Sequence, residues 1–293
     1  MAGRSALKTA LEQLCTSRST DRLANDPLAF CHRFHDPADQ EIAALIAAVF
    51  AYGSVKVIRG SLDRIFTIIG SSPTGFIDNL DPQQQRSLLS SFKHRFNSGD
   101  DLTALFWAIR QMRQQEGNIE RFFCRFHDPA AATVEQGLNG FCAAVLALDY
   151  RPVFGADGLP DTGNFRFLFP SPDRGSACKR LCMFLRWVVR PADGIDLGLW
   201  HQVQPEQLII PVDRHIERIA RLLGLTGRRS ADWCMACEIT TALRRFDRRD
   251  PVKYDFSLCH LGISEGCNGR HGDACHTCPV AGFCASGSME TAG

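Results

Sequence analysis

The sequence lacks any hydrophobic run long enough to cross a membrane. Its longest apolar runs, Ile42 to Ala51 and Leu181 to Val189, reach roughly half of the ~20 residues that a bilayer-spanning helix needs. The N-terminus carries Arg4, Lys8 and Glu12 among polar residues, so the uninterrupted apolar core of a secretory signal is missing there. We therefore expect a cytoplasmic protein with no membrane partner and with reduced thiols.

The sequence also lacks a series of short alternating strands separated by hairpin turns. Apolar residues recur instead at helical spacing, which predicts an all-α fold. One such face comprises Ile42, Leu45, Ile46, Val49 and Phe50, and a second, after Gly53, comprises Val57, Ile58, Leu62, Ile65, Phe66 and Ile69. Further helices are expected near Pro82 to Phe92, Asp101 to Gln115, Ile119 to Phe126 and Ala131 to Leu148.

A long loop is expected from Arg151 to Pro170, because this segment is rich in Gly, Pro and Asp. A loop of this length favours a division of the chain into two helical lobes with a cleft between them. The first would be a middle helical domain at residues 39–190. The second would combine residues 1–38 with residues 191–293.

Lysine is scarce, with five in the whole chain and none at residues 180–252, and the net charge is only +1. Basic residues nevertheless gather in the C-terminal half. Ser171 begins a predicted helix that runs to Arg190, and its Lys179, Arg186 and Arg190 share one side of that helix. Phosphate is a natural partner for such a basic stripe. We expect the protein to be a monomer.

Four of the 13 cysteines lie within 18 positions near the C-terminus. Cys267 and Cys275 are separated by seven residues, Cys275 and Cys278 by two, and Cys278 and Cys284 by five. Clustered cysteines in a reducing compartment more often bind metal than form disulfides. Four thiolates suit a 4Fe-4S cluster, and they also suit a zinc ion. By contrast, we expect the Cys234 and Cys237 pair to pack in a helical core.

The cysteine loop resembles the C-terminal 4Fe-4S loop of the helix-hairpin-helix DNA glycosylase superfamily, of the endonuclease III type. Its first gap is one residue longer than in that pattern. The resemblance implies that Cys267, Cys275, Cys278 and Cys284 each supply one thiolate. It also implies that Arg270 and His271, between the first two ligands, approach the DNA backbone.

A second resemblance to this superfamily lies at Ile210-Pro211-Val212-Asp213-Arg214-His215, where an aspartate opens a helix. The resemblance implies that Asp213 is catalytic. A carboxylate there suits stabilising the positive charge that develops on deoxyribose as a glycosidic bond breaks. Taken alone, Asp213 is also a good helix N-cap without a further role.

Lys179 is the nearest lysine upstream of Asp213, 34 positions away, and the Gly-rich hairpin that carries the lysine of lyase-competent members is missing. The resemblance implies a Schiff-base nucleophile at Lys179, and a solvated lysine is the alternative. The resemblance also implies that Tyr52, nearer the N-terminus, inserts into DNA as a wedge, with Lys56 nearby to contact phosphate. The alternative is that Tyr52 is an aromatic residue packed at a helix end.

Most of residues 25–265 also resemble an uncharacterised bacterial family, known only as a domain of unknown function, which we place within the same superfamily. Lys179-Arg180-Leu181, Leu185-Arg186-Trp187 and Pro211-Val212-Asp213 carry this likeness. The function that we expect is a DNA repair glycosylase that excises a damaged base from double-stranded DNA, with abasic-site lyase activity through Lys179. The alternative is a non-catalytic iron-sulfur protein of the same fold that binds nucleic acid.

Overall fold

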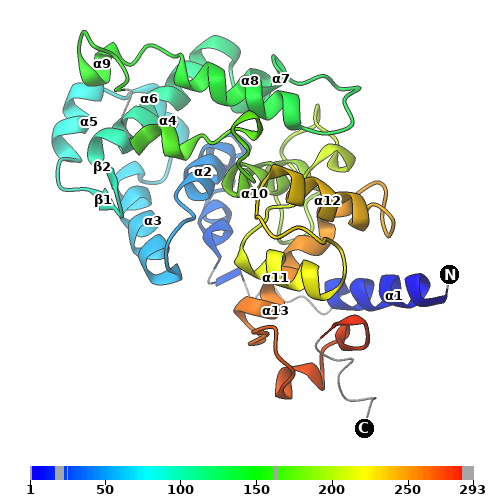
Figure 1. Cartoon of the computed structure of the whole chain (residues 1–293). Coiled ribbons are helices and arrows are strands. Elements are labelled where there is room, and N and C mark those ends of the chain that lie inside the picture. Colours follow the sequence, from blue (N-terminus) through cyan, green and yellow to red (C-terminus); the bar gives the residue numbers. More distant parts are fainter. Residues whose placement is uncertain (1, 17–22, 25, 161–163, 286–293) are drawn as a thin grey trace.

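The computed structural model describes residues 2–16, 23–24, 26–160 and 164–285. In this part the chain is predominantly helical, as its apolar spacing predicts, and the strands form a single short antiparallel hairpin (Figure 1). The α-helices are α1 (Ala2–Thr16), α2 (Pro37–Val49), α3 (Val55–Ile69), α4 (Pro73–Asp78), α5 (Pro82–Leu88), α6 (Gly99–Glu116), α7 (Ile119–Cys124), α8 (Glu135–Leu146), α9 (Arg151–Phe154), α10 (Lys179–Val189), α11 (Arg214–Leu222), α12 (Trp233–Leu243) and α13 (Asp255–Ile263).

Two strands and several 3-10 turns connect these helices. The strands β1 (Lys93–His94) and β2 (Asn97–Ser98) pair in antiparallel register, with Lys93 opposite Ser98. The 3-10 turns are η2 (Pro27–Arg33), η3 (Asn164–Leu168), η4 (Pro172–Arg174), η5 (Pro205–Gln207), η6 (Pro251–Tyr254), η7 (Asp273–Cys275) and η8 (Ala281–Phe283). The expected loop between Arg151 and Pro170 thus includes the short helix α9 and the turn η3.

Short polar side chains fix where several helices begin. Asp36 caps α2, and its carboxylate accepts hydrogen bonds from the backbone N–H groups of Ala38 and Asp39. Ser54 caps α3 in the same way through Val57. The first four N–H groups of a helix have no partner inside it, so these side chains stabilise the helix start.

The centre of the core is α2, which packs against η2 and α10. Every residue from Glu41 to Ala51 is buried. A polar residue in such a place needs partners, and the Glu41 carboxylate accepts hydrogen bonds from the indole of Trp200 at 2.7 Å and from the N–H groups that open α7. Burial raises the pKa of this carboxyl.

The two ends of the described chain lie near each other. Helix α1 contacts η6 and α13, and the cysteine-bearing segment lies next to α11 and α13 at one end of the molecule (Figure 1). The division into two lobes stays a prediction. No helix of the described residues combines the length and the apolar character needed to cross a bilayer.

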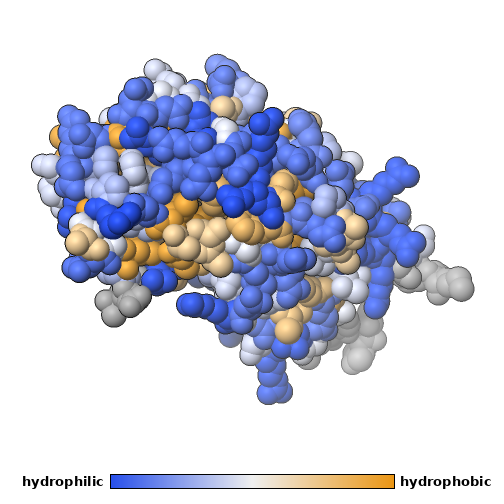
Figure 2. Space-filling view, turned by 90° about the horizontal axis from the view of Figure 1, so that it is seen from above, coloured by the Kyte–Doolittle hydropathy of each residue, from blue (hydrophilic) through white to orange (hydrophobic). Residues whose placement is uncertain are grey.

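Hydrophobic side chains also reach the surface. Figure 2 shows a band of hydrophobic residues that crosses one face between hydrophilic ones. The large hydrophobic side chains that are exposed in the described residues are Val55, Val57, Ile68, Leu88, Phe96, Phe167 and Ile263. Phe96 and Phe167 are the aromatic members of this set, and they touch each other.

Candidate active site and cysteine cavity

The predicted helix from Ser171 to Arg190 is interrupted. Pro172–Arg174 forms only the turn η4, and α10 begins at Lys179. Between them Cys178 has a φ of 47°, in the left-handed region that side chains other than glycine rarely adopt. Such a conformation costs of order 1 kcal/mol and persists only where the surrounding structure enforces it. The enforced turn places the side chain of Lys179 at the very start of a buried helix.

Arg186 and Arg190 do not form the predicted DNA-binding stripe. They are only 4% and 5% exposed, because α10 is buried on every side from Arg180 to Val189. Arg186 pairs with Asp196 at 3.1 Å and with Asp255 at 2.5 Å, and Arg190 pairs with Asp196 and Asp250. Buried charges need such partners, so both arginines are structural ions in the core.

Asp213 is the N-cap of α11, as the sequence pattern predicts. Its Oδ1 accepts hydrogen bonds from the N–H groups of His215 and Ile216, both at 2.8 Å. Its Oδ2 lies 3.4 Å from the thiol Sγ of Cys259 on α13. Capping therefore occupies one carboxylate oxygen, and the second faces a half-buried polar neighbourhood.

Lys179 lies in that same neighbourhood. Its charge acts on the ionisation of Cys259 and of His215, and Asp213 acts on both of these groups as well. No carboxylate of the described residues lies within 4.0 Å of the Lys179 ammonium, although the side chain is half-buried. The charges of Lys179 and Asp213, 34 positions apart in the chain, thus act on the same two groups, and Lys179 forms no direct ion pair within the described residues.

Asp26 also interacts electrostatically with Lys179, and the sequence patterns do not reveal this residue. It caps η2 through the N–H of Leu28, and its charge interacts with those of Arg186 and Lys179. Burial raises the pKa of the Asp26 carboxyl, and the two cations oppose that shift. A carboxylate with a raised pKa is a better proton acceptor than an ordinary aspartate, and the charge of this one interacts with that of Lys179.

His215 completes the group. Burial lowers the pKa of its imidazole, and the neighbouring Arg214, Arg218 and Lys179 charges lower it further against the opposing effect of Asp213. The ring packs so closely on Gly262 of α13 that a Cβ there would come within 2.1 Å of the imidazole Nδ1. Gly262 therefore allows α11 and α13 to approach, which is what brings Cys259 to Asp213.

The four C-terminal cysteines surround one cavity. Cys267, Cys275, Cys278 and Cys284 all line a space of about 160 Å³, together with apolar residues of α11 and α13. Burial raises the pKa of the Cys278 thiol, and the nearby Cys267 and Cys275 raise it further. Four sulfur donors around one enclosed space form a donor set that a 4Fe-4S cluster can use.

No group of three or more His, Cys, Asp or Glu side chains in the described residues is placed to hold a metal ion. This finding applies to a 4Fe-4S cluster as it does to a zinc ion. Both assignments of the four thiols therefore stay predictions.

The cysteine segment is tied to the helix that Asp213 opens. The guanidinium of Arg218 donates to the carbonyl oxygen of Cys267, and the N–H of Ala285 donates to the carbonyl of Leu222 at 2.9 Å. Both Arg218 and Leu222 belong to α11. Order in the cysteine segment therefore supports the position of α11.

Cys234 and Cys237 lie on α12, apart from this cavity. Cys237 is half-buried and packs against the core, whereas Cys234 is exposed. The prediction of core packing is therefore wrong for Cys234. This residue is exposed because α12 buries the face that carries Trp233, Met235 and Ala236.

Tyr52 has the position of an aromatic residue packed at a helix end. Its hydroxyl contacts Asn97 and donates to the carbonyl of His94 at 3.2 Å, and its ring meets that of Phe167 at 5.0 Å. A side chain anchored at its tip is not free to insert between bases, so the wedge role is not supported. Lys56, on the first turn of α3, is exposed.

Arg270 and His271 are exposed on the cysteine segment, and both line the rim of its cavity. Their position is compatible with contact to an outside partner. The role in approaching DNA stays a prediction for these two residues.

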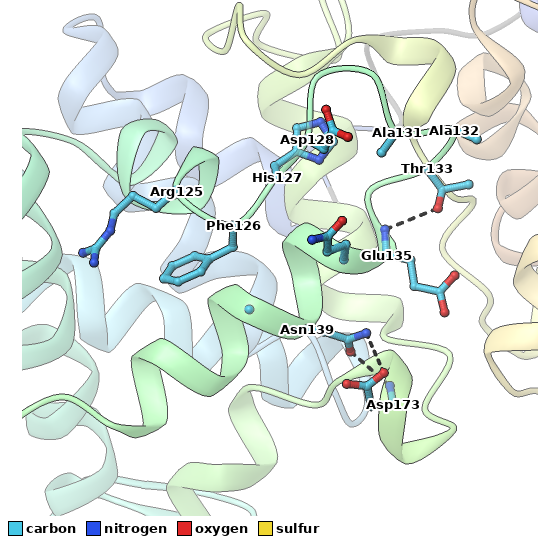
Figure 3. Close-up of a pocket in the computed structure, with 12 residues that line it drawn as sticks. Arg125, Phe126, His127, Asp128, Ala131, Ala132, Thr133, Glu135, Asn139 and Asp173 are labelled. Carbon is cyan, nitrogen blue, oxygen red and sulfur yellow. Dashed lines mark hydrogen bonds between the residues drawn. The ribbon is translucent and has the colours of Figure 1, made fainter.

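A larger depression of about 820 Å³ lies between the start of α8 and the turn that follows α7 (Figure 3). It carries the carboxylates of Asp128, Glu135 and Asp173, and Asp173 is joined to Asn139 by hydrogen bonds of 2.7 and 3.0 Å. An acidic lining repels phosphate. We therefore place no nucleic acid at this depression.

Residues 26–264 match the family model described as "Protein of unknown function (DUF2400)". The chain belongs to this family. The match ends before the first cysteine of the cavity, so membership of DUF2400 does not bear on the cysteine segment. No curated protein and no solved structure matches the chain.

The assignment to the helix-hairpin-helix glycosylase superfamily is wrong. No glycosylase family model matches, and DUF2400 is not evidently part of that superfamily. The likeness rested on short segments around Asp213 and the cysteines. An aspartate that caps a helix and a cysteine-rich loop both arise for local physical reasons, so neither identifies a superfamily.

Proposed function

We propose that this DUF2400 protein is an enzyme that cleaves the N-glycosidic bond of a damaged base in DNA. The observation that carries the proposal is the grouping of Lys179, Asp213 and Asp26. The charge of Lys179 acts on Asp26 and on two neighbours of Asp213, so one amine and two carboxylates share a region of the structure. Such groups can supply a nucleophile, a proton acceptor and stabilisation of a carbon that becomes cationic.

Each residue has a defined part in the proposed reaction. Asp26 accepts a proton from Lys179 through a bridging water, because no carboxylate of the described residues lies within 4.0 Å of the ammonium. The amine lone pair then forms a bond to C1′ while the bond from C1′ to the base breaks and its electron pair leaves with the base. The Oδ2 oxygen of Asp213, which does not take part in the helix cap, stabilises the positive charge that develops on the sugar. The resulting amine adduct can open the sugar and lead to strand cleavage, which is the proposed lyase activity.

The same proposal assigns a 4Fe-4S cluster to Cys267, Cys275, Cys278 and Cys284. The four thiols around one cavity support it. When bound, the cluster would stabilise the C-terminal segment, and no step of the reaction runs through it. Because Arg218 joins this segment to α11, the cluster would act on the site by holding Asp213 in place.

The proposal is tested with duplexes that each carry one oxidised, alkylated or deaminated base. Purified protein should release free base from at least one of them, as measured by chromatography of the reaction products. Binding of lesion-bearing duplexes without release of base from any of them would favour the second candidate, a non-catalytic nucleic-acid-binding protein. The exposed basic and aromatic residues near Tyr52 favour that candidate.

A further inference from the structure

We propose that Phe96 and Phe167 form a platform on which an unpaired nucleotide base stacks. The two rings meet edge to face with their centroids 4.7 Å apart. Phe96 is 42% exposed and Phe167 is 43% exposed, in a protein whose other aromatic rings are largely buried. The inference rests on the proposed nucleic-acid partner, and it names the part of that partner that this surface binds.

The platform is exposed but firmly held. Phe96 lies in the turn between β1 and β2, and Phe167 lies on η3. The side chain of Asn164 donates to the carbonyl of Phe96 at 2.7 Å, and the buried Asn97 donates to the carbonyl of Asn164 at 3.0 Å. These bonds lock the two segments together, so little rotational freedom is lost when a ligand stacks on the rings.

A buried cation lies directly beneath the platform. The guanidinium carbon of Arg180 is 4.0 Å from the centroid of Phe167 and 5.1 Å from that of Tyr52. Arg180 donates to the carbonyls of Val49 and Phe167, and no carboxylate of the described residues pairs with it. Burial lowers the pKa of this guanidinium to about 10, so it remains charged at neutral pH. A positive charge without a counter-ion favours an anionic partner.

The surroundings of the platform are basic. The three segments that build it, residues 50–62, 90–99 and 164–170, contain five basic residues and no acidic one. Lys56, Lys93 and Arg95 are exposed, and Arg95 packs over Gly53, where a Cβ would come within 3.1 Å of its side chain. Aromatic rings for bases and cations for phosphates are the combination that binds single-stranded nucleic acid.

Charge decides between this occupant and a protein partner. A second copy of the chain would bring the same positive charges, those of Arg180 and of the exposed Lys56, Lys93 and Arg95, against each other. An apolar partner would leave these charges without counter-ions. A nucleic-acid strand can stack its bases on the rings and pair its phosphates with the cations. Lys179, the residue before Arg180, opens the same helix, α10.

The test is binding of a fluorescein-labelled single-stranded oligothymidylate of 20 nucleotides, followed by anisotropy. Phe96→Ala should weaken binding roughly 10-fold, because stacking of one base is worth about 1–3 kcal/mol. Leu88→Ala, the matched control at a side chain 64% exposed on α5, should leave binding unchanged. Equal affinities for the two variants would overturn the proposal. So would a change of oligomeric state in Phe96→Ala, because the platform would then be an interface between copies.

Two activities of the wild type, release of damaged bases and binding of a single strand, separate this inference from the proposed enzyme. If the wild type releases damaged bases from duplexes but binds no single strand, the platform is wrong and the enzyme stands. If it binds single strands through Phe96 but releases no base, the enzyme is wrong and the platform stands.

Discussion

The guanidinium Nη1 of Arg186 lies 2.5 Å from Oδ2 of Asp255, and both side chains are 5% exposed. A buried ion pair leaves an uncompensated charge when one partner is removed. We expect Arg186→Ala to lower the free energy of unfolding by about 3–5 kcal/mol in urea denaturation. The control is Arg33→Ala, since the Arg33 and Asp63 pair is half-exposed and such surface pairs contribute at most about 1 kcal/mol. Similar losses in the two variants would contradict the structural role of Arg186.

The buried ion pair of Arg186 and Asp255 also makes the free energy of unfolding depend on pH. Burial raises the pKa of Asp255 to about 6 against the opposing charge and hydrogen bond of Arg186, and the charges of Asp213 and Asp196 add to the effect of burial. Between pH 4 and 6 the folded protein therefore keeps a proton that the unfolded chain has released, so the stability from this group is lost as pH rises through 6. Relative to Asp255→Asn, the wild type should lose up to about 3 kcal/mol between pH 4 and pH 7.

Urea unfolding of both proteins across that pH range measures the difference. Asp63→Asn is the control at an exposed carboxyl. The difference in the free energy of unfolding between this variant and the wild type should not show the same change between pH 4 and pH 7. A wild type that gains stability over Asp255→Asn as pH rises would mean that the pKa of Asp255 is lowered in the folded state.

Iron content tests the cysteine cavity. Purified protein should be brown, with about four irons per chain. Cys278→Ser should lose iron and destabilise the C-terminal segment, because it removes one of the four thiols around the cavity. Cys234→Ser should keep its iron, because this exposed thiol lies on α12. Colourless protein with one zinc per chain would refute the cluster, and equal iron loss in the two variants would refute the choice of thiols.

Local features of the fold could be predicted from the sequence. The helices α2 and α3 follow from apolar spacing and from the caps Asp36 and Ser54, which act within three residues. The helix after Asp213 follows from the same kind of signal. These elements depend on interactions between neighbours along the chain, and such interactions are visible in the sequence itself.

Long-range packing could not be predicted. The sequence shows that Arg186 and Arg190 share a helix face. Their partners Asp255 and Asp250 lie 69 and 60 residues further along the chain, so the face alone indicates an exposed basic stripe. Asp26 joins Lys179 only because η2 packs against α2. The break at Cys178 has no signal in the sequence, because cysteine has no preference for a positive φ.

Trapping with borohydride tests Lys179 as the nucleophile. An amine that attacks C1′ forms an imine, and reduction of this imine should give a covalent protein-DNA adduct visible by gel electrophoresis. Lys179→Gln should give no adduct, whereas Lys253→Gln, at a lysine that pairs with Glu12 and Asp247, should give it undiminished. Base excision by Lys179→Gln without an adduct would mean that water attacks the sugar and that Lys179 serves only strand cleavage.

The most direct measurement of the central claim is release of free base by Asp213→Asn compared with Asp232→Asn. Both aspartates cap a helix, and asparagine caps as well as aspartate, so both variants should fold and bind DNA. They differ in that Asp213 lies in the group with Lys179 and Asp232 does not. The account predicts that Asp213→Asn abolishes release of the damaged base while Asp232→Asn retains the wild-type rate. Full activity in Asp213→Asn would show that Asp213 is only a helix cap and that the active site lies elsewhere.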